Sequence, residues 1–293
     1  MSRICEGRVC AITGGARGIG LAYAEALIAA GARVVVNDVD RDAADTAVAA
    51  LTVDRSVAIA HVGDVSTATG AEQLVQTALD RWGRIDVVVN NAGITRDRML
   101  VNLSESDWDD VLRVHLRSTF LLTQTVARHW REQSKAGVVV DGRVINTVSA
   151  VGLFGHAGQS NYAAAKGAIA AFTVTTALEL ERYGVTVNAI CPTALTDMTA
   201  SVLGDSDDAR SGALDPSWVA PAVVWLASSE SADVTGRVVI ASGRRLAVAE
   251  GWHRGPTAEA VHDPATAGEV LRRLLVEAAP NADDQGTIPD PSR

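Results

Sequence analysis

Residues 13–20 read Thr-Gly-Gly-Ala-Arg-Gly-Ile-Gly and follow directly on the apolar run Val9–Thr13. The helix-forming segment Ile19–Ala30 comes next, so the glycines stand where an expected strand passes into an expected helix. Glycine lets the backbone turn sharply and approach a ligand closely, and the N-terminus of a helix attracts negative charge. The pattern predicts a loop that binds the pyrophosphate of a dinucleotide rather than a glycine-rich turn without a ligand. The expected binding residues of this loop are Gly14, Arg17, Gly18, Ile19 and Gly20.

Outward from this loop, short apolar runs rich in Val and Ile alternate with longer helix-period segments. Several runs are apolar on both faces, as strands are when helices cover both sides of a parallel sheet. The alternation predicts an α/β fold with a doubly wound parallel seven-stranded sheet of the Rossmann type. The expected strands are Val9–Thr13, Arg33–Asn37, Val57–His61, Asp86–Asn90, Arg143–Val148, Thr186–Cys191 and Val238–Ala241. The expected helices are Ile19–Ala30, Ala43–Leu51, Ala71–Trp82, Ser106–Gln133, Ser160–Tyr183 and Pro216–Ala227.

This alternation ends near residue 245, and no proline- or serine-rich linker interrupts it earlier. We therefore predict one dinucleotide-binding catalytic domain over residues 1–245 and a C-terminal extension over residues 246–293. Within the extension, residues 266–279 carry Val and Leu on one side and predict a short amphipathic helix. Residues 280–293 are polar and contain prolines, which predicts a frayed tail.

Composition and charge exclude several classes of partner. The chain has 26 basic and 35 acidic residues, and its formal net charge of −9 disfavours nucleic acid and anionic membranes. No apolar run approaches the roughly 18–20 residues of a membrane span, and the first residues contain no apolar signal core. The cysteines are too few and too scattered for a disulfide framework or a zinc site. We expect a cytoplasmic protein without a metal site.

Asp38 and Arg17 make opposite predictions about the dinucleotide. Asp38 ends the second expected strand, where its carboxylate can accept hydrogen bonds from the adenosine ribose and repel the 2′-phosphate of NADP. Arg17 lies inside the loop and could pair with that phosphate. A buried clash between like charges costs more than a surface arginine contact returns, so we expect NAD. The alternative role for Asp38 is that of an ordinary helix N-cap.

Polar residues also follow the third and fourth expected strands. Asp64 and Val65 follow the third, where a short acidic side chain could meet the adenine amino group. Asn91 and Gly93 belong to the Asn-Asn-Ala-Gly stretch at residues 90–93, after the fourth. Asp and Asn are common in turns, so each signal is weak alone. Their positions at successive carboxyl ends of parallel strands predict one shared cleft.

Tyr162 and Lys166 stand four residues apart on an expected helix and therefore share a face. An ammonium near a phenol stabilises the phenolate, which would bring the phenol pKa from about 10 towards neutrality for general acid or base work. Ser149 precedes Tyr162 by 13 residues, just past the fifth strand, and could hydrogen-bond the reacting oxygen. A Tyr-x-x-x-Lys pair alone is usually a solvated helix face. Combined with Ser149 behind a dinucleotide loop, it indicates a catalytic set.

Together these segments resemble the short-chain dehydrogenase/reductase family over roughly residues 5–245. The resemblance rests on TGGARGIG, NNAG, Ser149 with Tyr162-Ala-Ala-Ala-Lys166, and the Cys191-Pro192 step. Within the family, VVVND, NNAGITRDRML and WDDVLRVHLRSTF are most similar to the (3R)-hydroxyacyl-CoA dehydrogenase unit of type-2 peroxisomal multifunctional enzymes and its bacterial relatives.

The resemblance implies hydride transfer between NAD(H) and a secondary alcohol or ketone, with a 3-hydroxyacyl-CoA or a related hydroxyacyl or steroid substrate. It assigns proton exchange to Tyr162, orientation of the carbonyl to Ser149, and the nicotinamide ribose to Lys166. Pro192 and Thr196 fall where relatives contact the nicotinamide end. The family pairs two long helices in a four-helix contact, which implies a homodimer or homotetramer.

Three positions depart from the family pattern. His115 stands where many relatives have an asparagine that holds a water in the proton relay, so we expect an altered relay, with a satisfied core histidine as the alternative. Thr193 replaces the glycine after Pro192, and Arg244 replaces the second glycine after the last strand. These two changes affect the substrate side more than the cofactor side.

Two other functions remain open from the sequence. An NADPH-linked 3-oxoacyl or carbonyl reductase has local support from Arg17 alone. A cofactor-binding pseudoenzyme is disfavoured by the intact set of Ser149, Tyr162 and Lys166.

Overall fold

All strands lie in one sheet in the order β3-β2-β1-β4-β5-β6-β7-β8. The computed structural model describes residues 3–52, 56–196, 198–200, 204–283 and 286–288. Strands β1 to β7 are parallel, and β8 runs antiparallel to β7. The chain order reverses between β1 and β4, which is where open α/β sheets bind ligands. The strands are β1 (Val9–Thr13), β2 (Arg33–Asp38), β3 (Ala58–Val62), β4 (Val87–Asn90), β5 (Gly142–Thr147), β6 (Val185–Thr193), β7 (Val238–Ser242) and β8 (Arg245–Ala249).

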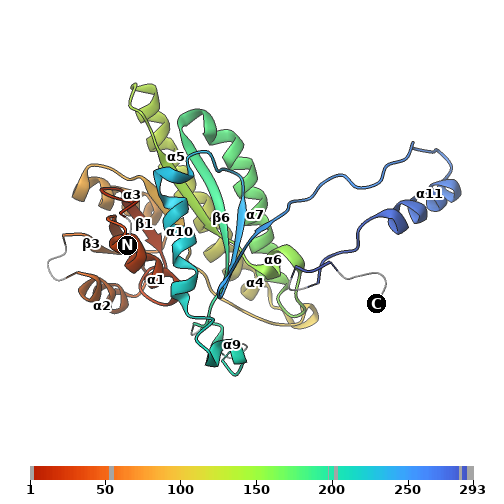
Figure 1. Cartoon of the computed structure of the whole chain (residues 1–293), viewed down its shortest axis with the longest axis horizontal. Helices are drawn as coiled ribbons and strands as arrows, with labels where there is room; N and C mark the ends of the chain where they lie inside the picture. The colour runs from red at the N-terminus through yellow and green to blue at the C-terminus, as the bar shows by residue number, and fades with distance from the viewer. Residues whose placement is uncertain (1–2, 53–55, 197, 201–203, 284–285, 289–293) are drawn as a thin grey trace.

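Helices cover both faces of the sheet (Figure 1). Side chains of α1, α2 and α10 pack on one face, and those of α3, α5 and α7 pack on the other. Every residue of β1 is buried because its side chains alternate between these two cores. The helices are α1 (Gly18–Ala29), α2 (Arg41–Leu51), α3 (Ala68–Trp82), α4 (Glu105–Leu112), α5 (Ser118–Lys135), α6 (Ala150–Phe154), α7 (Ser160–Leu180), α9 (Asp207–Arg210), α10 (Ala220–Ala227) and α11 (Pro264–Glu277).

The expected seven parallel strands are all present, but the sheet has an eighth strand that the sequence did not predict. Ser242 pairs with Arg245, so Gly243 and Arg244 form the two-residue turn of a hairpin between β7 and β8. Gly243 has a φ of +54°, which such a turn requires and which other residues rarely adopt. The departing residue Arg244 thus lies in the turn of this hairpin, and β8 crosses the domain boundary expected at residue 245.

The single helix expected over Ser106–Gln133 is divided into α4 and α5 by a π-helical turn at Arg113–Arg117. Two hydroxyl groups bond to the carbonyl oxygens around this turn. Ser118 Oγ donates to Val114 O at 2.5 Å, and Thr119 Oγ1 donates to His115 O at 2.8 Å. The sequence analysis expected one continuous helix here and did not detect this π-helical turn.

The segment Ser160–Tyr183, which contains α7, is long and apolar enough by length and composition to cross a membrane. A buried core helix passes the same test, so this is weak evidence for a membrane span and does not overturn the expectation. The helix nevertheless packs within the fold, where Ile169 and Ala177 belong to its buried cores. It also carries both Tyr162 and Lys166.

The C-terminal extension leaves the body after β8, passes through α11 and returns beside α6 (Figure 1). The helix expected at 266–279 is found at Pro264–Glu277, where its apolar stripe, including Leu271 and Leu275, stays exposed. In the tail expected to be frayed over 280–293, Thr287 N donates to Asp283 Oδ1 at 2.8 Å and closes a turn, while residues 284–285 and 289–293 lie outside the described residues. A side chain at Gly286 would overlap the ring of Phe154 in α6, so this turn lies directly on that helix.

Candidate active site

The glycine loop, residues 13–20, connects β1 to α1 at the carboxyl edge of the sheet. Gly14 and Gly18 adopt positive φ, and a Cβ on Gly20 would overlap the carbonyl oxygen of Gly14. No side chain caps α1, whereas Asp40 caps α2 and Thr67 caps α3. The first N–H groups of α1 therefore have no capping partner, and they fit the pyrophosphate of a dinucleotide.

Asn91 supports this loop from the neighbouring strand end. Its side-chain amide donates to Thr13 O and to Gly14 O, both at 3.1 Å. The N–H groups of Asn91 and Ala92 in turn donate to Thr13 Oγ1 at 2.9 and 3.0 Å. Asn91 therefore positions the loop, and Thr13 is a partner that sequence reasoning missed.

At the adenosine end, Asp38 is the last residue of β2, and its Oδ1 accepts the N–H of Asp40 at 3.1 Å. The N-cap of α2 is Asp40 and not Asp38, because Asp40 Oδ1 accepts the N–H of Ala43 at 3.1 Å. Arg17 Nη2 donates to Asp40 Oδ2 at 2.6 Å. The sequence suggested that the Arg17 guanidinium could bind a phosphate. In the structure it is paired with the carboxylate of Asp40, a partner that the sequence analysis did not identify.

Asp64 is tied to the π-helical turn. Its Oδ1 accepts the N–H of Ser66 at 2.9 Å, and its Oδ2 accepts from Arg113 Nη1 at 3.2 Å. Val65 is buried in the core under α3 and presents no polar side chain. This ion pair connects the end of β3 to the segment that holds His115, a connection between residues 49 apart in sequence.

Ser149, Tyr162 and Lys166 come together where the end of β5 meets α7. Ser149 is the N-cap of α6, a helix the sequence did not predict, and it accepts the N–H of Val151 at 3.3 Å. Lys166 Nζ lies 5.7 Å from the centre of the Tyr162 ring and donates to Thr147 O at 2.7 Å. The set proposed from spacing alone is therefore assembled in three dimensions.

The electrostatics of this set differ from the expectation. Burial raises the pKa of Tyr162 to about 12, against the opposing effect of a hydrogen bond with Ser149. Burial also lowers the pKa of Lys166 to about 7. The expected shift of the phenol towards neutrality is therefore wrong for this structure, because a dry site disfavours both the phenolate and the ammonium.

His115 lies in the π-helical turn with its ring edge-on to Tyr162, at 5.2 Å between ring centres. Its Nε2 is 2.7 Å from Ile94 O and 3.0 Å from Ile94 N. Its Nδ1 is buried and has no hydrogen-bond partner among the described residues. Burial, and then the charge of Lys166, lower the pKa of His115 to about 3, so the ring is neutral. A side chain at Gly93 would overlap this ring, which explains the glycine there.

The profile described as short chain dehydrogenase matches residues 8–207. The chain belongs to the short-chain dehydrogenase family. It is 46% identical over 258 residues to hydroxyacyl-CoA dehydrogenase ChsB1 of Mycobacterium tuberculosis, covering 85% of this chain and 81% of that protein. It is 40% identical over 247 residues to peroxisomal multifunctional enzyme type 2 of Mus musculus, covering 81% of this chain and 32% of that protein. The crystal structure of a short chain dehydrogenase from Mycobacterium avium is 46% identical with a TM-score of 0.88, covering 96% of this chain and 98% of that one.

Membership of the short-chain dehydrogenase family makes the chain an oxidoreductase that uses a nicotinamide cofactor, and it confirms the resemblance drawn from the motifs. The remaining residues expected at the nicotinamide end lie after or within β6. Pro192 pairs with Ala241 of β7 in the sheet. Thr196 lies over the loop, where a Cβ on Gly18 would be 3.3 Å from Thr196 Cγ2. In the stretch that follows Thr196, residues 197 and 201–203 lie outside the described residues.

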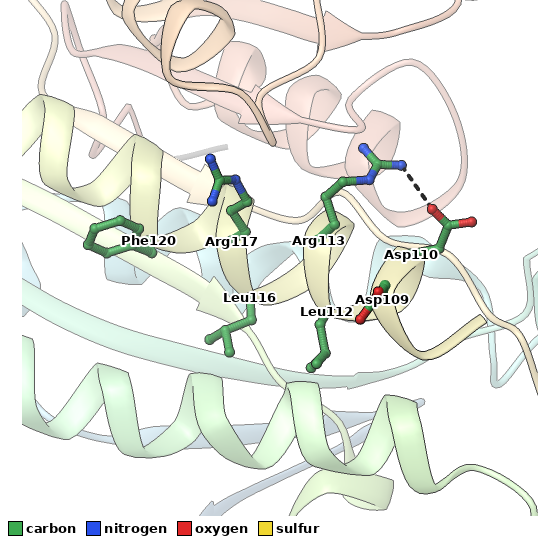
Figure 2. A pocket seen from close by; sticks show the side chains of 7 residues that line it. All are labelled: Asp109, Asp110, Leu112, Arg113, Leu116, Arg117 and Phe120. Carbon is green, nitrogen blue, oxygen red and sulfur yellow. Dashed lines mark hydrogen bonds and ion pairs between the residues drawn. The ribbon is translucent and has the colours of Figure 1, made fainter. Parts of the chain in front are cut away.

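Two surface hollows lie away from this site, on the outer helices. One measures about 460 Å³ and is lined by residues of α4, the π-helical turn and α5. Figure 2 shows Leu112 and Leu116 pointing away from Arg113 and Arg117, which lie on the opposite side of this segment. The second measures about 610 Å³ and lies between α5 and α7. Neither hollow contains Ser149, Tyr162 or Lys166.

Replacing Tyr162 by Phe removes the phenolic hydroxyl and leaves the ring in place. We expect kcat for alcohol oxidation to fall by at least ~100-fold, in line with the usual contribution of a general acid or base. Cofactor affinity should stay within about twofold of wild type, measured by fluorescence titration. Steady-state kinetics with near-normal kcat would contradict the assignment of proton exchange to Tyr162.

The neutral, buried His115 also predicts how stability depends on pH. A free histidine titrates near 6.5, so below that pH the unfolded chain binds a proton that the native chain does not. His115 should therefore lower the free energy of unfolding by about 2 kcal/mol between pH 7 and pH 5.

The His115→Gln variant should lack this part of the pH dependence, while His61 and His129 remain in both proteins. Urea unfolding at pH 7 and pH 5 measures the difference. An identical loss of stability in wild type and variant would show that His115 is protonated in the native state.

Proposed function

We propose that this short-chain dehydrogenase oxidises the secondary alcohol of a 3-hydroxyacyl-CoA, or a related hydroxyacyl or steroid substrate, with NAD. The contacts that bring Ser149, Tyr162 and Lys166 together carry the proposal. The relative from Mycobacterium tuberculosis named a hydroxyacyl-CoA dehydrogenase supports the substrate class. A panel of 3-hydroxyacyl-CoA esters and hydroxysteroids, assayed with NAD, tests it. Failure to oxidise any of them would favour the pseudoenzyme alternative.

In the proposed reaction, Tyr162 exchanges the proton of the substrate hydroxyl, and Ser149 holds the same oxygen through its own hydroxyl. A bound NAD supplies the carbon that accepts hydride. Because burial keeps the phenol protonated, its resting state suits donation to a ketone, and oxidation of an alcohol requires its deprotonation. Lys166, with a pKa of about 7, can hold or release a proton at Nζ near neutral pH.

His115 is proposed to act beside this pair. Its edge-on contact with Tyr162 and its unpartnered Nδ1 place a hydrogen-bond acceptor or donor at the position where many relatives have asparagine. A neutral ring can orient a hydroxyl or a water without adding charge next to Lys166.

The carboxylates near Arg17 support NAD rather than NADP as the cofactor in this proposal. Asp38 ends β2, where a carboxylate can grip the adenosine ribose and repel a 2′-phosphate. Arg17, which supports the NADPH-linked alternative, is already paired with Asp40. We also propose a cytoplasmic location. The three cysteines are free and buried, which suits a reducing compartment.

Wild-type protein should prefer NAD over NADP by about a hundredfold in kcat/KM, because NADP loses the ribose contacts and brings a phosphate to the carboxylate. Replacing Asp38 by Ser should remove the repulsion and weaken the ribose grip, so that the preference approaches unity. Initial rates with both nucleotides measure this. Equal use of NADP by wild type would reject the preference assigned to Asp38.

We also propose a homodimer or homotetramer. The outer faces of α5 and α7 expose Phe120, Val174 and Leu178 by 41%, 47% and 74% beside the second hollow. Phe120 and Phe172 form an edge-on pair across the two helices, with 6.5 Å between ring centres. Such a grouped apolar surface suits burial against a second copy better than exposure to water.

Leu178→Asp should reduce the molar mass in solution towards the 30.6 kDa of a single chain, because it places a charge in the proposed contact. Val139→Asp is the matched control, since Val139 is 94% exposed in the loop before β5 and lies outside this surface. Light scattering at micromolar concentration compares the three proteins. A wild-type protein that is already monomeric would reject the proposal.

A further inference from the structure

Asp40 joins three parts of the cofactor edge. Its backbone N–H donates to Asp38 Oδ1 at the end of β2, and its Oδ1 accepts the N–H of Ala43 in the first turn of α2. Its Oδ2 accepts from Arg17 Nη2 of the glycine loop at 2.6 Å. Both carboxylate oxygens of Asp40 are therefore engaged, and one of them fixes the guanidinium of Arg17.

We propose that Asp40 determines nucleotide specificity by holding Arg17 away from the 2′-phosphate of an NADP-type nucleotide. The inference rests on the NAD preference proposed above. Asp38 acts on the ribose directly, whereas Asp40 acts through Arg17 and is a positioning residue.

Charge balance at this edge supports the role. Arg17 contributes one positive charge, and Asp38 and Asp40 each contribute one negative charge, so this trio is net negative. A 2′-phosphate that recruited Arg17 would compete with Asp40 for the guanidinium, and it would face the two carboxylates of Asp38 and Asp40. The side chains of Arg17 and Asp40 are 58% and 48% exposed, so this ion pair contributes little to the stability of the fold. Its effect should appear instead in the choice between NAD and NADP.

The two carboxylate oxygens of Asp40 make different contacts: Oδ1 accepts from Ala43 N, and Oδ2 accepts from Arg17. A substitution can therefore keep the first contact and remove the second. Serine is a good N-cap, so Asp40→Ser should preserve the bond from Ala43 N while removing the charge that holds Arg17. Asp40→Asn is a second variant that keeps an N-cap of nearly the same size. Arg17→Ala, alone and with Asp40→Ser, shows whether any gain depends on the guanidinium.

The experiment measures binding of two small probes, AMP and adenosine 2′,5′-bisphosphate, to the full-length chain by isothermal titration calorimetry. Asp40→Ser should bind the bisphosphate about fivefold more tightly than wild type, with AMP binding within about twofold. The gain should disappear in the Asp40→Ser/Arg17→Ala protein. Thermal unfolding of each variant verifies that the fold is intact.

The outcomes separate this inference from the proposed function. A wild type that favours NAD, with no bisphosphate gain in either Asp40 variant, overturns the role of Asp40 and leaves the NAD assignment intact. A gain that persists after Arg17→Ala also overturns it, because the effect would then be the lost carboxylate alone. A wild type that binds the bisphosphate more tightly than AMP overturns both the NAD preference and the role of Asp40.

Discussion

The amide of Asn91 donates to the carbonyl oxygens of Thr13 and Gly14, and the cofactor side of the molecule depends on this contact. It fixes the glycine loop against the end of β4, at the point where the strand order reverses. With the loop held there, the uncapped start of α1 faces the crevice, and Gly20 allows the helix to close on Gly14. A dinucleotide cradle is thus formed by backbone groups and needs few side chains of its own.

Around that cradle, burial sets the protonation of the catalytic side chains. Tyr162 is held as a phenol, Lys166 titrates near neutral pH, and His115 is kept neutral. A site of this kind holds protons that can be exchanged and little net charge.

Contacts between distant segments connect the two ends of the cleft. Arg113 binds Asp64 past the end of β3, and two residues later the same π-helical turn presents His115 to Tyr162. At the ribose edge, Asp40 links Arg17 to Asp38. The positions of the cofactor residues and of the catalytic residues therefore depend on a shared set of ion pairs and turns.

The sequence alone determined the features whose cause is local. The strands are predictable from apolar runs, the glycine loop from its strand–turn–helix setting, and the shared face of Tyr162 and Lys166 from helical spacing. Ser149 followed from its place at a strand end. In each case the pattern and the structure concern residues within one element or at its border.

The tertiary structure decided what requires a partner far along the chain. The π-helical turn is tied to residues well before it, since Arg113 pairs with Asp64 and His115 contacts the backbone of Ile94. The hold of Asp40 on Arg17 spans 23 residues, and a sequence pattern gives no sign of it. The pKa of Tyr162 was misjudged for the same reason: burial arises from every element packed around a side chain, whereas spacing reveals only its neighbours along one helix.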